Sequence, residues 1–223
     1  MPSTLTPRAP WRVICFDLDG TLCDTQEGIL RSLHYALEGL GIDPGDRDLW
    51  ALIGPPLQEI FSDGFDLDPP GVENAMRIYR EFYADEGIFM NTPYPGMPKL
   101  LRDLAASSAK LTVCTAKPWV YAEKLLRAHD LLECFDFVSG PELDGTRRTK
   151  PEIITHALDN IREAAGDDIV MIGDRHYDIT GSRALGLPSI GVDWGFAPPG
   201  ELDAAAPTWR ASSTADLRPL LLA

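Results

Sequence analysis

The stretch FDLDGTLCDT, residues 16–25, places two aspartates, Asp17 and Asp19, two positions apart at the end of an apolar run. The run Val13–Phe16 is short and continuously apolar, which is typical of a parallel strand covered on both faces. Two like charges are costly where burial begins, unless a ligand or a cation compensates them. The stretch therefore predicts a buried parallel strand with a functional site at its carboxyl end, where open parallel sheets bind ligands.

The rest of the chain repeats this strand signal, with helical patterns between the strands. Further apolar runs predict strands at residues 111–114 (LTVC), 135–139 (FDFVS), 169–173 (IVMIG) and 188–192 (PSIGV). Helices are expected over residues 97–105, 119–132, 151–164 and 179–187. A last short strand around residues 207–210 and a closing helix from Thr214 complete the pattern. Because strands alternate with helices, the sequence predicts an α/β fold with a Rossmann-like parallel sheet core.

Residues 25–92 differ from the rest, because they show helical spacing and no strong strand signal. Helices are expected over residues 29–40, 50–61 and 72–83, with a turn or kink at GPPL, residues 54–57. We therefore predict two domains. Residues 1–24 and 93–223 form the Rossmann-like catalytic core, and residues 25–92 form an inserted α-helical cap domain.

The composition limits the partners that the protein can have. A formal net charge of −14 disfavours nucleic acid and anionic membranes, because binding either usually needs a basic face. No apolar run approaches the roughly 20 residues of a membrane helix. The start, MPSTLTPRAP, is expected to be a short disordered leader and lacks the apolar stretch of a signal peptide. The four cysteines form no CxxC pair, so we expect reduced thiols. Because no export signal is visible, we expect a cytoplasmic protein, and its assembly stays open between a monomer and a homodimer.

Polar side chains gather where the predicted strands end. These are Asp17 and Asp19 after the first strand, Thr115 and Lys117 after the second, Lys150 at the helix after the third, and Asp174 and Asp178 after the fourth. Taken singly, such an aspartate is a helix cap and such a lysine is a solvated surface residue. Taken together, several carboxylates converge on one edge, where they repel one another without a cation. Carboxylates with no histidine or cysteine partner favour a hard cation, Mg²⁺ before Zn²⁺.

In this order, these residues resemble the motifs of the haloacid dehalogenase (HAD) superfamily of hydrolases. The motifs are DLDGT at residues 17–21, the strand-ending Thr115, Lys150 in TKPE, and GDRHYD at residues 173–178. The resemblance covers the whole chain, including the helical cap inserted after the first motif. It is greatest to the phosphoglycolate-phosphatase-like branch, through the local sequences DGTLCDT, TAKP and GDRxxDIxGS.

The resemblance implies a Mg²⁺-dependent phosphatase that works through an aspartyl-phosphate. Asp17 would be the catalytic nucleophile and Asp19 the general acid–base. The metal would be held by the side chains of Asp17 and Asp174 and by the backbone carbonyl of Asp19, with Asp178 in support. Lys150 would neutralise charge on Asp17 and on the phosphoryl group.

The same resemblance implies a set of groups that hold the phosphoryl oxygens. Thr115 would donate a hydrogen bond to one of them, joined by backbone N–H groups near Gly20 and Ala116. The candidate substrate-binding residues are Gly20, Thr21, Ala116, Lys117 and Arg31. Among these, Lys117 and Arg31 are suited to a substrate carboxylate.

The substrate stays open at this point. By resemblance it is a small phosphomonoester, with 2-phosphoglycolate first. The cap has four arginines and thirteen carboxylates, a formal charge of −9, which disfavours a polyanion. The alternative is a 5′-nucleotidase whose base platform would come from Phe61, Phe65, Tyr79, Phe82 or Tyr83. A β-phosphoglucomutase-like phosphosugar mutase is less favoured, and the intact Asp17, Asp19, Lys150 and Asp174 disfavour a binding protein with an inactive phosphatase fold.

Overall fold

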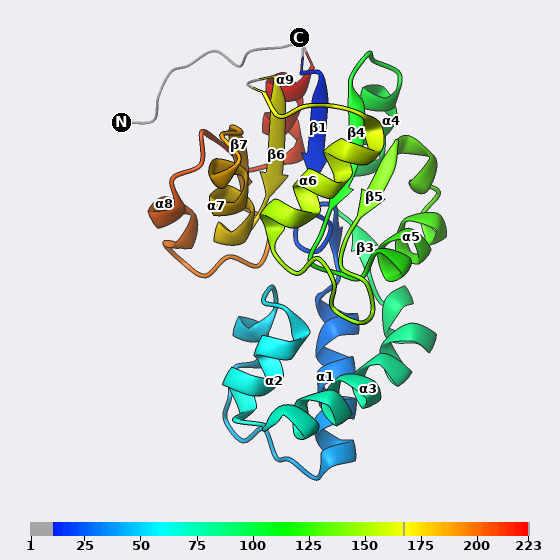
Figure 1. The fold of residues 1–223 in the computed structure, drawn as a ribbon, viewed down its shortest axis with the longest axis vertical. Coiled ribbons are helices and arrows are strands. Elements are labelled where there is room, and N and C mark those ends of the chain that lie inside the picture. The colour runs from blue at the N-terminus through cyan, green and yellow to red at the C-terminus, as the bar shows by residue number, and fades with distance from the viewer. Residues whose placement is uncertain (1–10, 167, 223) are drawn as a thin grey trace. The chain divides into compact units, whose positions relative to one another are not determined.

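A computed structural model describes residues 11–166 and 168–222, so the expected disordered leader lies outside the described residues. The chain divides into two compact units. The core unit comprises the residues up to Cys23 and from Pro93 onward, and the helical unit comprises Asp24–Thr92. At the two crossings the short strands β2 (Cys23–Asp24) and β3 (Thr92–Pro93) pair with each other. Figure 1 shows both units.

The core unit is built on one parallel sheet of six strands. Their order is β5–β4–β1–β6–β7–β8, and every neighbouring pair is parallel. The strands are β1 (Val13–Phe16), β4 (Lys110–Cys114), β5 (Phe137–Ser139), β6 (Ile169–Gly173), β7 (Ser189–Val192) and β8 (Trp209–Ala211). Phe16 lies opposite Val113 on one side and Ile172 on the other, so three strands end level with one another. The predicted α/β, Rossmann-like parallel sheet is confirmed.

Helices cover the sheet of the core unit. Their bounds are α4 (Met97–Ala105), α5 (Trp119–Ala128), η3 (Leu132–Cys134), α6 (Lys150–Ile161), α7 (His176–Ala184), α8 (Glu201–Ala205) and α9 (Thr214–Leu221). In Figure 1, α6 and α7 lie over one face, and α4 and α9 pack against each other on the opposite face. Alternate residues of a strand point to one face, so Val13 and Cys15 pack with Ile153 and Ile154 of α6 in one buried cluster. This packing fixes where α6 lies along the strands, and with it the position of its first residue, Lys150.

The helical unit consists of α1 (Gln26–Leu40), η1 (Leu49–Leu52), α2 (Leu57–Phe65), α3 (Pro69–Asp85) and η2 (Gly87–Phe89). Its two longest helices, α1 and α3, pack against each other. Gly41 ends α1 in the left-handed conformation, with φ of 68°, which glycine adopts readily. Among the described residues, no helix is both long and apolar enough to cross a membrane.

The single helix expected over residues 50–61 is wrong. A short 3₁₀ turn, η1, ends at Leu52, and the helix α2 begins only at Leu57. Two prolines separate them, and Pro56 is extended, with φ of −54° and ψ of 139°. A proline disfavours the helical conformation in the residue before it, so the kink expected at GPPL is a complete break.

The start of α6 gives a first testable prediction, because a capping box fixes it. The Thr149 Oγ1 accepts a hydrogen bond from the Glu152 N–H (3.4 Å), and the Glu152 carboxylate accepts one from the Thr149 N–H (2.9 Å). Thr149→Ala is expected to lower the free energy of unfolding by about 1 kcal/mol, measured by urea denaturation. Thr180→Ala is the matched control, an exposed threonine inside α7, with an expected change within about 0.5 kcal/mol. Equal losses in the two variants would contradict the capping role.

Candidate active site

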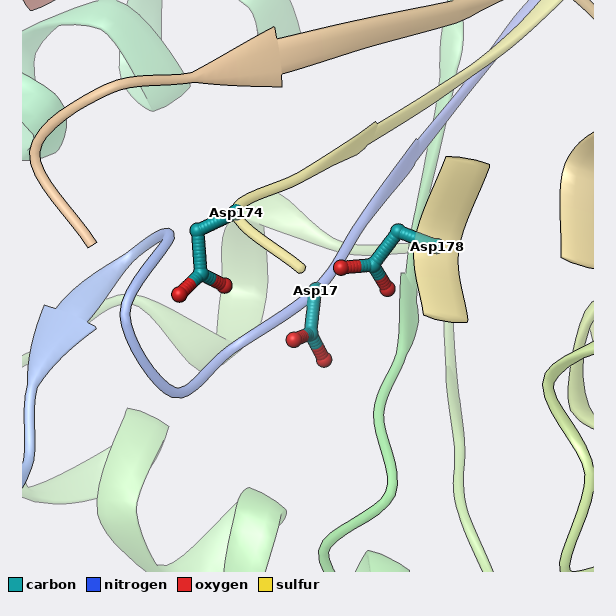
Figure 2. Close-up of side chains that lie close together, drawn as sticks. All are labelled: Asp17, Asp174 and Asp178. Carbon is teal, nitrogen blue, oxygen red and sulfur yellow. The ribbon is translucent and has the colours of Figure 1, made fainter. Parts of the chain in front are cut away.

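Three carboxylates from separate elements meet at the carboxyl edge of the sheet. Asp17 follows β1, Asp174 follows β6, and Asp178 lies in the first turn of α7. One ligand oxygen of each lies within 4.8 Å of the other two, and all three residues are buried (Figure 2). The Asp17 N–H donates to the Ile172 carbonyl (2.8 Å), which ties Asp17 to β6. The parallel register therefore brings together groups that are more than 150 residues apart in the sequence.

The buried Lys150 is the cation of this cluster. Its Nζ lies 2.6 Å from the Asp178 Oδ1 and 3.2 Å from the Asp17 Oδ1, and it donates a hydrogen bond to the Cys114 carbonyl (2.9 Å). Burial alone would lower the pKa of Lys150, but the charges of Asp17 and Asp178 raise it above its ordinary value. The lysine thus joins β1, β4 and α7 through one charged group.

One lysine does not balance three buried carboxylates. Burial raises the pKa of Asp17 to about 7. The charge of Lys150 lowers this pKa, but the charges of Asp178 and Asp19 act against Lys150 and raise it. Burial also raises the pKa of Asp174 well above its ordinary value, and the charges of Asp17 and Asp178 raise it further. A second positive charge would favour the ionised forms of these groups.

Asp174 is held from both sides. Its Oδ1 accepts a hydrogen bond from the Thr21 hydroxyl (3.1 Å), and its Oδ2 accepts one from the Phe196 N–H (2.7 Å). A Cβ at Gly20 or at Gly195 would lie 2.2 or 2.3 Å from that Oδ2, so only glycine fits at either position. Gly20 also has a φ of +77°, which favours glycine. Thr21 therefore orients Asp174, and its expected contact with the substrate stays a prediction.

Asp19 lies beside Lys117. The Lys117 Nζ is 2.8 Å from the Asp19 Oδ1, and the two side chains are only 7% and 18% exposed. Lys117 was expected to bind a substrate anion, but its partner in the structure is the predicted general acid–base. The backbone around Asp19 turns sharply, since the Gly20 N–H donates to the Cys23 carbonyl (2.9 Å).

Thr115 and Ala116 lie in the loop after β4. Thr115 is buried and its N–H donates to the Ser139 carbonyl (3.0 Å), which places it at the end of the sheet. Its Oγ1 accepts a hydrogen bond from the Lys117 N–H (3.1 Å), so this hydroxyl has its own hydrogen to donate. Ala116 follows it in the chain and is half-buried.

Arg31 lies in the helical unit, on α1. Its guanidinium pairs with Glu27 (2.6 Å), and its side chain is 59% exposed. It lines a groove of about 390 Å³ that the helical unit forms by itself. The other lining residues are Asp24, Gln26, Glu27, Leu30, His34, Met90, Asn91 and Thr92.

A second set of residues, which the sequence did not predict, surrounds the Asp174–Asp178 turn. Arg175, which is buried, forms a two-point ion pair with Glu201, the first residue of α8. Burial alone would raise the pKa of Glu201, but the hydrogen bonds from Arg175 and His176 lower it to about 2. No sequence signal pointed to Glu201, because α8 is a single short turn without apolar periodicity.

The donor set fits a hard divalent cation. The ligand oxygens of Asp17, Asp174 and Asp178 lie within reach of one ion, and no histidine or cysteine belongs to this cluster among the described residues. Oxygen-only sites of this kind favour Mg²⁺ or Ca²⁺ over zinc. The raised pKa values of Asp17 and Asp174 fit as well, because they indicate a deficit of positive charge.

The parallel sheet brings aspartates, a lysine and a threonine to one edge, which is where α/β enzymes bind their ligands. The chain belongs to the haloacid dehalogenase-like hydrolases, whose family model matches residues 14–192. A solved structure described as a predicted phosphatase from Clostridium acetobutylicum has the same fold, with a TM-score of 0.88 and 36% identity. It covers 93% of this chain, and 96% of its own chain is matched.

Two curated relatives extend this similarity. A "5'-nucleotidase" of Pseudomonas aeruginosa is 41% identical over 209 residues, which is 93% of this chain and 94% of that protein. The "Tyrosine-protein kinase PtkA" of Mycobacterium tuberculosis is 33% identical over 198 residues, which is 88% of this chain and 67% of that protein. With these relatives and its family, the chain is a phosphoric monoester hydrolase.

The charge deficit of the cluster gives a second prediction. In protein stripped of divalent ions, Asp174→Asn is expected to raise Tm, because it removes one of three repelling carboxylates and keeps an oxygen for the Phe196 N–H. Mg²⁺ at a hundredfold excess over Kd is expected to raise the wild-type Tm by about 5–10 °C and to leave the variant unchanged. Scanning calorimetry with and without Mg²⁺ measures both effects.

Asp193→Asn is the control for this experiment. Asp193 pairs with Arg210 and accepts a hydrogen bond from Ser212, so it is a strand-end carboxylate outside the cluster. This variant is expected to respond to Mg²⁺ as the wild type does. A wild-type Tm that Mg²⁺ does not change would contradict a metal site at Asp17, Asp174 and Asp178.

Proposed function

We propose that the chain is a Mg²⁺-dependent 5′-nucleotidase, which hydrolyses nucleoside monophosphates through an aspartyl-phosphate on Asp17. The observation that carries this proposal is the cluster of Asp17, Asp174 and Asp178 around Lys150, with Asp19 beside it. The choice of nucleotide is supported by the relative of that name, which matches this chain over nearly its full length.

In the first half-reaction, an Asp17 carboxylate oxygen attacks phosphorus. The bond between phosphorus and the ribose 5′-oxygen breaks, and Asp19 donates a proton to that oxygen as the nucleoside leaves. The Thr115 hydroxyl donates to a phosphoryl oxygen, and so do backbone N–H groups near Gly20 and Ala116. Lys150 compensates the charge that gathers on Asp17 and on the phosphoryl group.

In the second half-reaction, water attacks the phosphorus of the aspartyl-phosphate. Asp19 takes a proton from that water, the bond between phosphorus and the Asp17 oxygen breaks, and inorganic phosphate leaves. Asp17 and Asp19 thereby return to their starting states. Lys117, 2.8 Å from the Asp19 carboxylate, holds Asp19 in place through both steps.

The residues present would hold Mg²⁺ through the carboxylates of Asp17 and Asp174 and the backbone carbonyl of Asp19, with Asp178 in support. When bound, the ion supplies positive charge that screens the phosphoryl oxygens from the attacking carboxylate. The protein itself keeps the carboxylate oxygens in position before the ion binds, as the two hydrogen bonds to Asp174 do.

The phosphoglycolate implied by the resemblance is matched by solved structures that are described, by prediction only, as phosphoglycolate phosphatases, but these are 24% identical or less and support the shared fold alone. The cap aromatics expected to stack a base are mostly in the interior. Phe61, Phe65, Tyr79 and Tyr83 are buried, and Tyr79 and Tyr83 stack on each other. Phe82 is half-buried and stacks on Tyr35. These rings stabilise the helical unit, so the nucleoside needs another site.

We infer that the helical unit acts as the cap and that its groove holds the nucleoside. The groove volume of about 390 Å³ is within the range of small-molecule sites. Leu30 and Met90 offer apolar surface to a base, and Gln26 and Asn91 offer amide groups. Asp24 and Thr92, which also line the groove, are the residues at which the chain enters and leaves the helical unit.

A substrate panel tests the activity and the substrate together. Wild-type protein is expected to release phosphate from nucleoside 5′-monophosphates with a higher kcat/KM than from 2-phosphoglycolate or sugar phosphates. EDTA is expected to abolish release. Asp17→Asn is expected to lower kcat by at least about 10³-fold, since it removes the nucleophile.

The panel separates the alternatives. A preference for 2-phosphoglycolate would overturn the nucleotide and leave the phosphatase chemistry standing. Interconversion of glucose phosphate isomers would favour a mutase. An Asp17→Asn variant as active as the wild type would overturn the aspartyl-phosphate mechanism.

The groove gives a separate prediction. Arg31→Ala is expected to raise KM for nucleotides by about tenfold, because one lost contact of 1.4 kcal/mol is tenfold in affinity, and to leave kcat nearly unchanged. Arg77→Ala is the matched control, because Arg77 also pairs with a glutamate one helical turn away and is 60% exposed, outside this groove. Equal kinetics in the two variants would remove the groove from the substrate site.

A further inference from the structure

The Glu201 carboxylate accepts hydrogen bonds from the turn that carries Asp174 and Asp178. Its Oε1 accepts hydrogen bonds from the Arg175 Nε (2.8 Å) and from the His176 backbone N–H (2.8 Å). Its Oε2 accepts one from an Arg175 terminal nitrogen (3.1 Å). This one carboxylate therefore binds two consecutive residues inside the turn.

The same turn is held from its inner side by Asp178. The Asp178 Oδ2 accepts a hydrogen bond from the Arg175 N–H (3.1 Å), and its Oδ1 lies beside Lys150. The backbone N–H groups of Arg175 and His176 are at the start of α7, where helical donors have no partner within the helix. Asp178 and Glu201 each satisfy one of them, so together they fix the direction in which α7 begins.

The segment that carries Glu201 also contacts Asp174. The Phe196 N–H donates to the Asp174 Oδ2 (2.7 Å), and the backbone at Gly195 approaches the same carboxylate closely. Residues 195–201 thus hold the Asp174 side chain through Phe196, and through Glu201 they hold the Arg175 side chain and the His176 backbone N–H. A shift of this segment would move Asp174 relative to Asp17.

We propose that Glu201 is a positioning residue for the metal site: through Arg175 and His176 it holds the Asp174–Asp178 turn in the form that gathers the carboxylates around one ion. Glu201 itself contacts neither the ion nor the substrate. The inference rests on the metal site proposed above and assigns a role to a residue outside the four motifs. Outer partners of this kind typically change metal affinity by about 10- to 100-fold when removed.

The decisive measurement is Mg²⁺ binding to the purified protein by isothermal titration calorimetry, with no substrate present. Glu201→Gln is expected to raise the Kd for Mg²⁺ by about 10- to 100-fold. Glu163→Gln is the matched control, because Glu163 also accepts from an arginine, Arg12, and is 19% exposed where Glu201 is 16% exposed. The control is expected to bind Mg²⁺ as the wild type does. In activity assays, the Glu201 variant is expected to need proportionately more Mg²⁺ for half-maximal phosphate release.

A second variant keeps the test decisive if Glu201→Gln folds poorly with Arg175 left unpaired. Replacing both residues, Arg175→Met with Glu201→Gln, removes the buried charge together with its partner, and such replacements are often neutral for stability. This folded double variant is expected to show the same loss of Mg²⁺ affinity. Wild-type affinity in the double variant, or an equal loss in Glu163→Gln, would overturn the positioning role. A wild-type protein that binds no Mg²⁺ would overturn the metal site itself.

Discussion

The contact of one buried ammonium group with two carboxylates and a carbonyl organises the core unit. The Lys150 Nζ meets Asp17, Asp178 and the Cys114 carbonyl, and these come from β1, α7 and β4. A charged group in the interior is costly unless it is paired, so these elements stay where the lysine can satisfy all three. The capping box at Thr149 and the apolar face of α6 determine where that ammonium lies. The packing of α6 therefore sets the position of Lys150, and Lys150 in turn compensates the charge of the carboxylates.

The helical unit is inserted between the two parts of the core unit, and the proposed function gives the two units different roles. The core unit contains every group assigned to bond making and breaking, and these groups lie directly after strands or at a helix start, so the sheet and its helices hold them in place. The helical unit carries most of the negative charge and its own groove. In the proposed function, the core sets which bond is cleaved, and the helical unit sets which molecule presents it.

The sequence predicted the sheet and the convergence of the charged residues on one edge, because both depend on local patterns. Continuous apolar runs indicated the strands, and short motifs at their ends indicated Asp17, Lys150 and Asp174. It did not predict Glu201, because a lone acid on a one-turn helix has meaning only through its contact with Arg175. Nor did it predict the ion pair between Lys117 and Asp19, because sequence spacing does not show that the two side chains meet. The cap aromatics were misread for the same reason, since composition does not distinguish a buried ring from an exposed one.

The close approach of backbone to the Asp174 carboxylate affects how relatives of this protein can be judged from sequence. A methyl group at Gly20 or Gly195 would occupy space that a carboxylate oxygen fills. A homologue could thus retain every aspartate and the lysine and still lose its activity through one added carbon atom. Inventories of catalytic residues would count such a pseudoenzyme as active. The glycines are therefore as diagnostic of a working site as the charged residues, although they take no part in the chemistry.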